Sequence, residues 1–478
     1  MTRTRWNGRT AALVAATLAS LLTAFTGSSI NVALPIIGRD FAMDAILLSW
    51  IPTSFLLAAA MFLVPIGRLA DIHGRKKVFA LGTAVFSGAS LLAGLAPSAT
   101  VLIAARALQG IGGAMISGTG VAILTSVFPP QERGRVLGIN VAAVYLGLSF
   151  GPSLGGILTQ QIGWRSIFFV TIPLGLVIIA FVLWLLDGEW AEARGEPFDV
   201  AGSVIYALAL VALMYGFSQL PGWAGAALIA AGLAGFAAFG AWELKAGSPV
   251  LNLRLFAGNR PFTFSNLAAL IHYSAVYAVT FLLSLYLQYI KALTPQQAGL
   301  VLIFQPVVQA VFSPAAGRLS DRVEPRILAS SGMMLTATGL CLLAFLGQGT
   351  PMWAIIANLI LFGLGYALFS SPNMNAVMGS VERKSYGVAS CMLSTMRLLG
   401  QMLSMGIATL LFALFLGRVE ITPELYPQFL VSARTTFAIF AVLCVIGVFA
   451  SLARGDIRAG SAQRRDGKIR MGTLDESR

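Results

Sequence analysis

The stretch GRLADIHGRKKVF, residues 67–79, gathers charged side chains in a chain that has few of them. Only 11% of all residues are charged, whereas about 25% are charged in a typical soluble domain. A similar stretch, GRLSDRVEPR, returns at residues 317–326. Two matching clusters so far apart indicate a chain built from two similar halves in parallel orientation, each with one charged loop.

The residues around the two clusters exclude an ordinary soluble protein. Hydrophobic residues make up 57% of the 478 positions, and the mean hydropathy is +0.82. Charge this sparse cannot cover the surface of a soluble fold of this length. Because about 20 apolar residues span a bilayer as a helix, the repeated apolar runs predict an all-α integral membrane protein.

The apolar runs predict fourteen transmembrane helices. We expect them near residues 11–34, 47–68, 78–97, 100–124, 136–158, 166–186, 200–218, 223–243, 263–289, 297–316, 328–347, 352–372, 387–416 and 434–453. The first run follows a basic start, as in a signal peptide, but further apolar runs continue directly after it. This continuity favours a retained first span.

The distribution of basic residues predicts the orientation in the membrane. An even number of spans places both termini on one side, and Lys and Arg gather in the loops and tails of that side. The positive-inside rule therefore indicates cytoplasmic termini. The net charge of +13 is then explained by basic cytoplasmic loops, and nucleic acid is not an expected partner.

The spacing of the charged loops predicts an insert of two spans. Eight expected spans separate the loops, whereas two plain six-span halves would place six between them. The predicted organisation is a cytoplasmic N-terminus (1–10), a first half (11–186), an insert with its flanking loops (187–262), a second half (263–453) and a polar, basic cytoplasmic tail (454–478).

Several motifs resemble those of the major facilitator superfamily and, within it, the fourteen-span drug:proton antiporters. GRLADIHGRKK is similar to the superfamily's loop between spans 2 and 3, RALQGIGG (106–113) to its span-4 motif, and GLSFGPSLGG (147–156) to the span-5 antiporter motif. NVALP (31–35) and GWRSIFFVTIPLG (163–175) are similar to signatures of the fourteen-span family in spans 1 and 6. The resemblance implies the major facilitator fold, two six-helix halves plus two inserted spans.

The resemblance also implies that the charged loop is a gate, closed on the cytoplasmic side while the outer side is open. The gating residues would be Gly67, Asp71, Gly74 and Arg75, with Asp321 and Arg322 as counterparts in the second half. Arg75 can hold Asp71 by a charge-assisted hydrogen bond. The alternative, that these loops only set the orientation, explains Arg and Lys but neither Asp71 nor the glycines.

Two arginines fall inside expected spans. Arg106 lies in the fourth span, where a bare arginine costs about 2.5–3.5 kcal/mol by insertion scales. It should face a polar partner or reach the membrane surface, and the resemblance favours a role in proton transfer. Arg397 lies in the thirteenth span. The antiporter motif adds glycines at helical spacing that favour close helix packing: Gly147, Gly151, Gly155 and Gly156. Pro152 among them removes a backbone hydrogen bond and should bend the fifth span.

Carboxylates are missing from the interior of every expected span. The resembled family usually has Asp nine residues before the proline of NVALP, but this chain has Thr26 there, so neutral or anionic substrates are expected. An unperturbed histidine titrates near pH 6.5, which makes His272 a candidate for proton coupling beside Arg106, although it also fits a packing role. The residues predicted to line a substrate cavity are Thr26, Asn31, Gln109, Tyr273, Gln305, Gln309, Asn375 and Arg397.

These features predict a proton-coupled exporter of lipophilic or drug-like compounds in the plasma membrane, working by alternating access. The alternative is an importer or uniporter of a neutral metabolite such as a vitamin, without proton coupling. An enzyme is not expected, because the sequence has no nucleophile motif or phosphate-binding loop. No cofactor or metal is expected either, since its three cysteines, Cys341, Cys391 and Cys444, form no ligand pattern. The sequence leaves the oligomeric state open.

Overall fold

The computed structural model describes residues 8–129, 132–186, 188–251, 253, 256, 258–381 and 386–455. In this part of the chain the secondary structure is helical, and 14 helices are long and apolar enough to cross a membrane. The predicted all-α class and the predicted number of spans are both confirmed. The predicted tail, 454–478, lies almost entirely outside the described residues.

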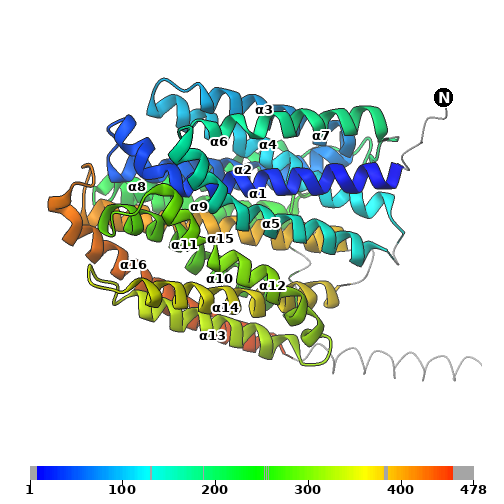
Figure 1. Cartoon of the computed structure of the whole chain (residues 1–478). Coiled ribbons are helices and arrows are strands. Elements are labelled where there is room, and N and C mark those ends of the chain that lie inside the picture. The colour runs from blue at the N-terminus through cyan, green and yellow to red at the C-terminus, as the bar shows by residue number, and fades with distance from the viewer. Residues whose placement is uncertain are drawn as a thin grey trace, which may run out of the picture.

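The helices pack as two groups joined by a hairpin (Figure 1). The first group comprises α1 (Gly8–Asp40), α2 (Ala45–His73), α3 (Arg75–Gly94), α4 (Ala99–Val127), α5 (Arg133–Gln161), α6 (Ser166–Phe169) and α7 (Thr171–Leu185). The hairpin, here called the insert, consists of α8 (Val200–Gln219) and α9 (Trp223–Lys245). The second group comprises α10 (Arg260–Leu285), the π-helical turn η2 (Tyr286–Ile290), α11 (Pro295–Leu302), α12 (Phe304–Ser320), α13 (Pro325–Leu343), α14 (Met352–Gly379), α15 (Tyr386–Phe415), the short η4 (Pro423–Leu425) and α16 (Tyr426–Ala453).

Two spans that the sequence predicts as single helices are interrupted. The sixth span breaks between α6 and α7, and the tenth breaks between α11 and α12. A proline ring clashes with the carbonyl of the residue four positions earlier. For Pro173 and Pro306 that residue is Phe169 and Leu302, the last residue of α6 and of α11 respectively. Each interruption therefore falls where the ring of the following proline clashes, although α1 and α5 accommodate Pro35 and Pro152 without a break.

The bundle has two ends, which we name by their loops. The basic end carries residues 68–77, 188–199 and 318–326, and the opposite end carries residues 40–44, 161–165 and 291–294. Hydrogen bonds between the two groups gather at the opposite end. Ser284 Oγ donates to the carbonyl of Asn31 (2.7 Å), and Gln288 Nε2 donates to the carbonyl of Val32 (2.9 Å).

Glycines bring the backbones of the two groups into contact at the same end. A Cβ on Gly156 of α5 would lie 2.5 Å from the carbonyl oxygen of Pro295, and one on Gly299 of α11 would lie 2.1 Å from the carbonyl oxygen of Pro152. Real Cβ contacts are not this short, so a side chain at either position would push α5 and α11 apart. The groups are therefore closed against each other at the opposite end.

The insert lies across the seam between the two groups. Helix α8 packs against α2 of the first group and α15 of the second. The Tyr206 hydroxyl of α8 donates to the carbonyl of Ala60 in α2 (3.3 Å). Both connections of the insert, to α7 and to α10, leave from the basic end.

Candidate functional site

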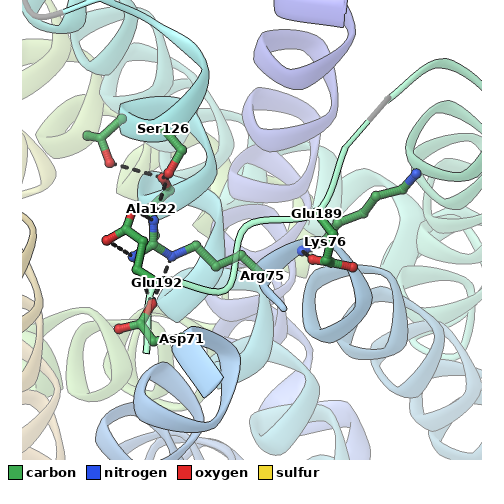
Figure 2. Close-up of polar contacts among 8 residues, drawn as sticks. Asp71, Arg75, Lys76, Ala122, Ser126, Glu189 and Glu192 are labelled. Atoms are coloured by element: carbon green, nitrogen blue, oxygen red, sulfur yellow. Dashed lines mark hydrogen bonds and ion pairs between the residues drawn. The ribbon is translucent and has the colours of Figure 1, made fainter. Parts of the chain in front are cut away.

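The charged loop at the basic end is organised around Arg75. Its side chain is almost buried, at 9% exposure. Nε donates to Asp71 Oδ1 (2.8 Å), and Nη1 donates to Ser126 Oγ (2.7 Å). Nη1 and Nη2 also donate to the two carboxylate oxygens of Glu192, at 2.8 and 3.0 Å (Figure 2). This bidentate geometry is the strongest that a guanidinium makes with a carboxylate, so two carboxylates neutralise one nearly buried cation.

Glu192 belongs to a segment that lies over the charged loop and that we call the strap, residues 188–196. The strap is attached through its backbone as well as its side chains. The amide of Arg75 donates to the carbonyl of Trp190, and the amide of Ala193 donates to the carbonyl of Asp71, both at 2.9 Å. The loop between α2 and α3 is therefore fastened to the connection that leads into the insert.

Two further glutamates of the strap bind the same loop. Glu189 Oε1 accepts from the amide of Lys76 (2.8 Å), and Glu196 pairs with Arg68. Gly74 has a φ of +117°, and a Cβ there would lie 2.4 Å from the carboxyl carbon of Glu189. Only glycine fits both the backbone conformation and the space. The sequence analysis did not predict that the strap binds the charged loop. The spacing of Glu189, Glu192 and Glu196, three and four positions apart, was the feature that could have indicated it.

The second charged loop has a different structure. Position for position, Pro325 stands where the first loop has Arg75, so the second loop has no guanidinium at that place. Asp321 and Arg322 are exposed in the turn between α12 and α13. The bonds of Arg75 to Asp71, Ser126 and Glu192, here called the clamp, therefore have no counterpart from Pro325. The gating role predicted for Asp321 and Arg322 stays a prediction.

Arg106 is held inside the first group and does not reach the membrane surface. It is 1% exposed. Nε donates to the carbonyl of Ile51 (3.3 Å), Nη1 donates to Gln109, and the guanidinium lies 4.5 Å from the ring centre of Phe55. Gln109 in turn donates to Ser90 Oγ (2.7 Å). These contacts replace hydration with neutral acceptors and an aromatic face.

A cluster of three tyrosines and one arginine lies where the two groups meet. Half-buried Arg397 of α15 interacts electrostatically with the hydroxyls of Tyr273 and Tyr366. The rings of these two tyrosines are 5.8 Å apart and edge-on. From the first group, the hydroxyl of half-buried Tyr145 lies 3.0 Å from Ser370 Oγ. We call Tyr145, Tyr273, Tyr366 and Arg397 the central cluster.

Sequence reasoning selected Tyr273 and Arg397 but not Tyr145 or Tyr366. Nothing in the local sequence distinguishes these two tyrosines from aromatic residues that face lipid. Arg106 is linked to the same region, because its charge acts on the hydroxyl of Tyr277 in α10. No Asp or Glu is among these residues.

His272 packs behind the central cluster. It is 0% exposed, and its ring stacks on Phe369 with 4.0 Å between centres. Nδ1 lies 3.9 Å from the sulfur of Cys444, and Nε2 has no hydrogen-bond partner among the described residues. The contacts are those of a packing residue, so a proton would reach this ring only after the aromatic side chains around it moved.

The other residues predicted for the cavity are placed by contacts of their own. Thr26 is 0% exposed, and its hydroxyl donates to the carbonyl of Leu22 in its own helix (2.8 Å). Asn31 and Gln309 are buried, Asn375 donates to Ser320, and Gln305 is half-buried in α12.

The antiporter motif packs mainly against α1. A Cβ on Gly147, Gly151 or Gly155 would fall within 2.6 Å of an atom of Leu21, Ser28 or Ser29 respectively, whereas Gly156 faces Pro295 of the second group. These are the closest helix contacts of the first group with α1.

Two helical groups, a seam closed at one end and an arginine–tyrosine cluster on that seam define the class: a two-half membrane transporter. The family model of the Major Facilitator Superfamily matches residues 16–241 and 266–469. The chain belongs to this superfamily.

Similar proteins include transporters of different substrates. The riboflavin transporter RibZ of Clostridioides difficile (strain 630) is 28% identical, with 89% of this chain and 93% of RibZ covered. The multidrug resistance protein Stp of Mycobacterium tuberculosis (strain CDC 1551 / Oshkosh) is 32% identical, with 81% and 73% covered. The crystal structure of a bacterial homologue of the human lysosomal transporter Spinster has a TM-score of 0.67 at 20% identity, with 94% and 97% covered. It supports the fold alone.

The clamp predicts a graded response to loss of its carboxylates. In Asp71→Asn, transport should be nearly abolished, because a charge-assisted hydrogen bond to a nearly buried guanidinium contributes about 1.5–3 kcal/mol. In Glu192→Gln, transport should fall only about two- to fivefold, because the Glu192 side chain is 68% exposed and water reduces even a bidentate pair to about 0.2–1 kcal/mol. The measurement is the initial transport rate divided by the amount of protein in the membrane.

Glu424→Gln is the matched control, because Glu424 is an exposed glutamate at the opposite end. It should transport normally. A loss in Asp71→Asn that is explained entirely by low membrane abundance would show that Asp71 serves insertion or folding rather than the transport cycle.

Proposed function

We propose that the protein is a proton-coupled exporter of lipophilic, neutral or anionic small molecules. The observation that carries the proposal is the central cluster, which joins the two groups and combines aromatic surface with a cation and no carboxylate. Aromatic side chains suit apolar ligands, and two arginines nearby disfavour a permanent cation, because like charges repel strongly where water is scarce. The name of the similar multidrug resistance protein agrees with export.

Alternating access would proceed from the conformation described above. We infer that the basic end faces the cytoplasm, because alternate loops concentrate Lys and Arg there. The present structure is closed at the opposite end, so substrate would enter from the basic end. Parting of α5 from α11 would then open the outer side, and the clamp would keep the loop between α2 and α3 ordered while the groups rock.

Proton coupling is assigned to Arg106 and His272. Arg106 links the first group to Tyr277 of the second, so a change in its contacts would be felt on both sides of the seam. His272 lies directly behind Tyr273 and Tyr366, with ring centres 5.9 and 5.3 Å away. Movement of those tyrosines during the cycle would open the imidazole to water and protons.

A second function, uptake or facilitated diffusion of a neutral vitamin-like metabolite, is favoured by the similarity to the riboflavin transporter. The two functions differ in proton movement. In everted vesicles loaded with a pH-sensitive dye, addition of an exported compound should release protons from the lumen, and His272→Gln should reduce that release more than it reduces substrate binding. Substrate entry that stops at equal concentrations inside and outside, with no proton movement, would support the uniporter instead.

Substrate charge gives an independent prediction. Cells that produce the protein should export a neutral or anionic dye at least about tenfold faster than a matched quaternary cation, because an unpaired cation near two arginines costs more than about 1.4 kcal/mol. Arg397→Gln should narrow this ratio by slowing export of the anion. Arg135→Gln, a change of an exposed arginine at the start of α5, should leave the ratio unchanged. Equal export of the cation by the wild type would contradict the proposed substrate class.

A further inference from the structure

The two connections of the insert meet at two carboxylates. Asp199 ends the connection from α7 and caps α8: its Oδ1 accepts from the amide of Gly202 (2.8 Å). Its oxygens also accept from Trp242 Nε1, at 3.1 and 3.0 Å. Glu243 lies in the last turn of α9, and its Oε2 accepts from the amide of Leu251 (3.0 Å), in the connection to α10. We call Asp199 and Glu243 the acid pair.

One oxygen of each carboxylate in the acid pair points at the same place. A Cβ on Gly202 would lie 2.4 Å from Asp199 Oδ2 and 2.8 Å from Glu243 Oε1, so both oxygens converge on the space that the missing side chain leaves. Glu243 is only 2% exposed, and its Oε1 has no hydrogen-bond partner among the described residues. A buried carboxylate oxygen without a donor is costly, and here it faces a second carboxylate.

No described cation balances the acid pair. Asp199 is the charged group that acts on Glu243. Lys245 is exposed and follows Glu243 by two positions, which places it on another side of α9. The glutamates of the strap are bonded to the charged loop, and the Trp242 donor is neutral and directed to Asp199. Two ionised carboxylates would therefore repel each other, and of the two only the half-buried Asp199 has access to water.

We propose that Asp199 and Glu243 share one bound proton, and that this proton controls the joint between the two connections of the insert. The proton comes from water and resides on Glu243 Oε1, which then donates a hydrogen bond to Asp199 Oδ2. Carboxylates that share a site commonly hold a single proton in this way. Loss of the proton leaves two negative charges, which separates the acid pair and loosens the contact between α8, α9 and the connection to α10.

The position of the joint suggests what the proton does. The insert bridges α2 of the first group and α15 of the second. Relative movement of the groups therefore acts on the joint, which is the contact between Asp199 and Glu243 that holds the two connections of the insert together. A protonated joint holds both connections together, and a deprotonated joint lets them move independently. The inference does not depend on which compound is transported, or on whether Arg106 or His272 carries a coupled proton.

Infrared difference spectroscopy on the purified full-length protein in lipid nanodiscs tests the proton directly. The wild type should show the carbonyl stretch of a protonated carboxylic acid, and this band should disappear as pH is raised. Glu243→Gln should remove the band, whereas the exposed control Glu424→Gln should retain it. In Asp199→Asn the band should persist only to a lower pH than in the wild type, because the neighbouring charge that favours protonation is gone.

Tryptic cleavage after the exposed Lys245 tests the joint. In the wild type the rate should rise about tenfold or more from the protonated to the deprotonated state, relative to a cleavage site elsewhere in the chain. In Glu243→Gln the relative rate should stay low at every pH, because the amide mimics the protonated acid.

Three results would overturn the proposal. The first is a wild type without the band at any pH at which it is folded. The second is a band that survives in Glu243→Gln. The third is a pair occupied by a metal ion, shown by Na⁺ or Ca²⁺ stabilising the wild type but not Asp199→Asn. Should Glu243→Gln fail to fold, Asp199→Asn and the wild-type cation titration still decide.

Discussion

The nearly buried guanidinium of Arg75 is the constraint on which the basic end depends. A cation in that position must be neutralised, and Asp71 and Glu192 do so at neighbouring edges of the guanidinium. Asp71 comes from α2, whereas Glu192 comes from the strap, 117 positions after Arg75. Neutralising one cation therefore also fixes the strap over the loop. Since the strap leads directly to Asp199 and α8, the same interaction determines where the insert begins.

The clamp joins elements of the first group only to the strap, so it makes that group and the connection to the insert one mechanical unit. The contacts that must change for access to alternate are different in kind. At the opposite end, glycines bring α5 and α11 backbone to backbone, and hydrogen bonds run from α10 and η2 to carbonyls of α1. Such contacts involve no charge and little side-chain rearrangement, so they can part and re-form while the charged end keeps its internal structure. The central cluster lies between these two regions, where both groups contribute side chains.

The sequence predicts the features that depend on composition and local spacing. The span number follows from apolar run length, and the bond from Arg75 to Asp71 follows from neighbouring residues at a helix junction. Pairs between distant segments were not predictable in the same way. Glu192 was visible only as part of a polar connection, and Tyr145 and Tyr366 resemble any aromatic residue of a lipid-facing span. The helix breaks before Pro173 and Pro306 could have been predicted, because the clash of a proline ring is a local effect. The length of an apolar run does not show them. Thr26 shows that a motif position can also suggest a role that the contacts do not support. Its place in a family motif suggested a cavity-lining residue, whereas its hydroxyl is bonded within α1.

The central claim is that the seam closed at the opposite end must open during transport. Ser49 of α2 and Thr409 of α15 report on it directly, because their hydroxyl oxygens are 2.8 Å apart across the seam. The measurement is transport by the Ser49→Cys, Thr409→Cys double variant, with Cys341, Cys391 and Cys444 replaced by alanine, before and after oxidation to a disulfide. The account predicts that oxidation stops transport, that reduction restores it, and that neither single-cysteine variant responds. Transport at an unchanged rate through the fully cross-linked protein would contradict it.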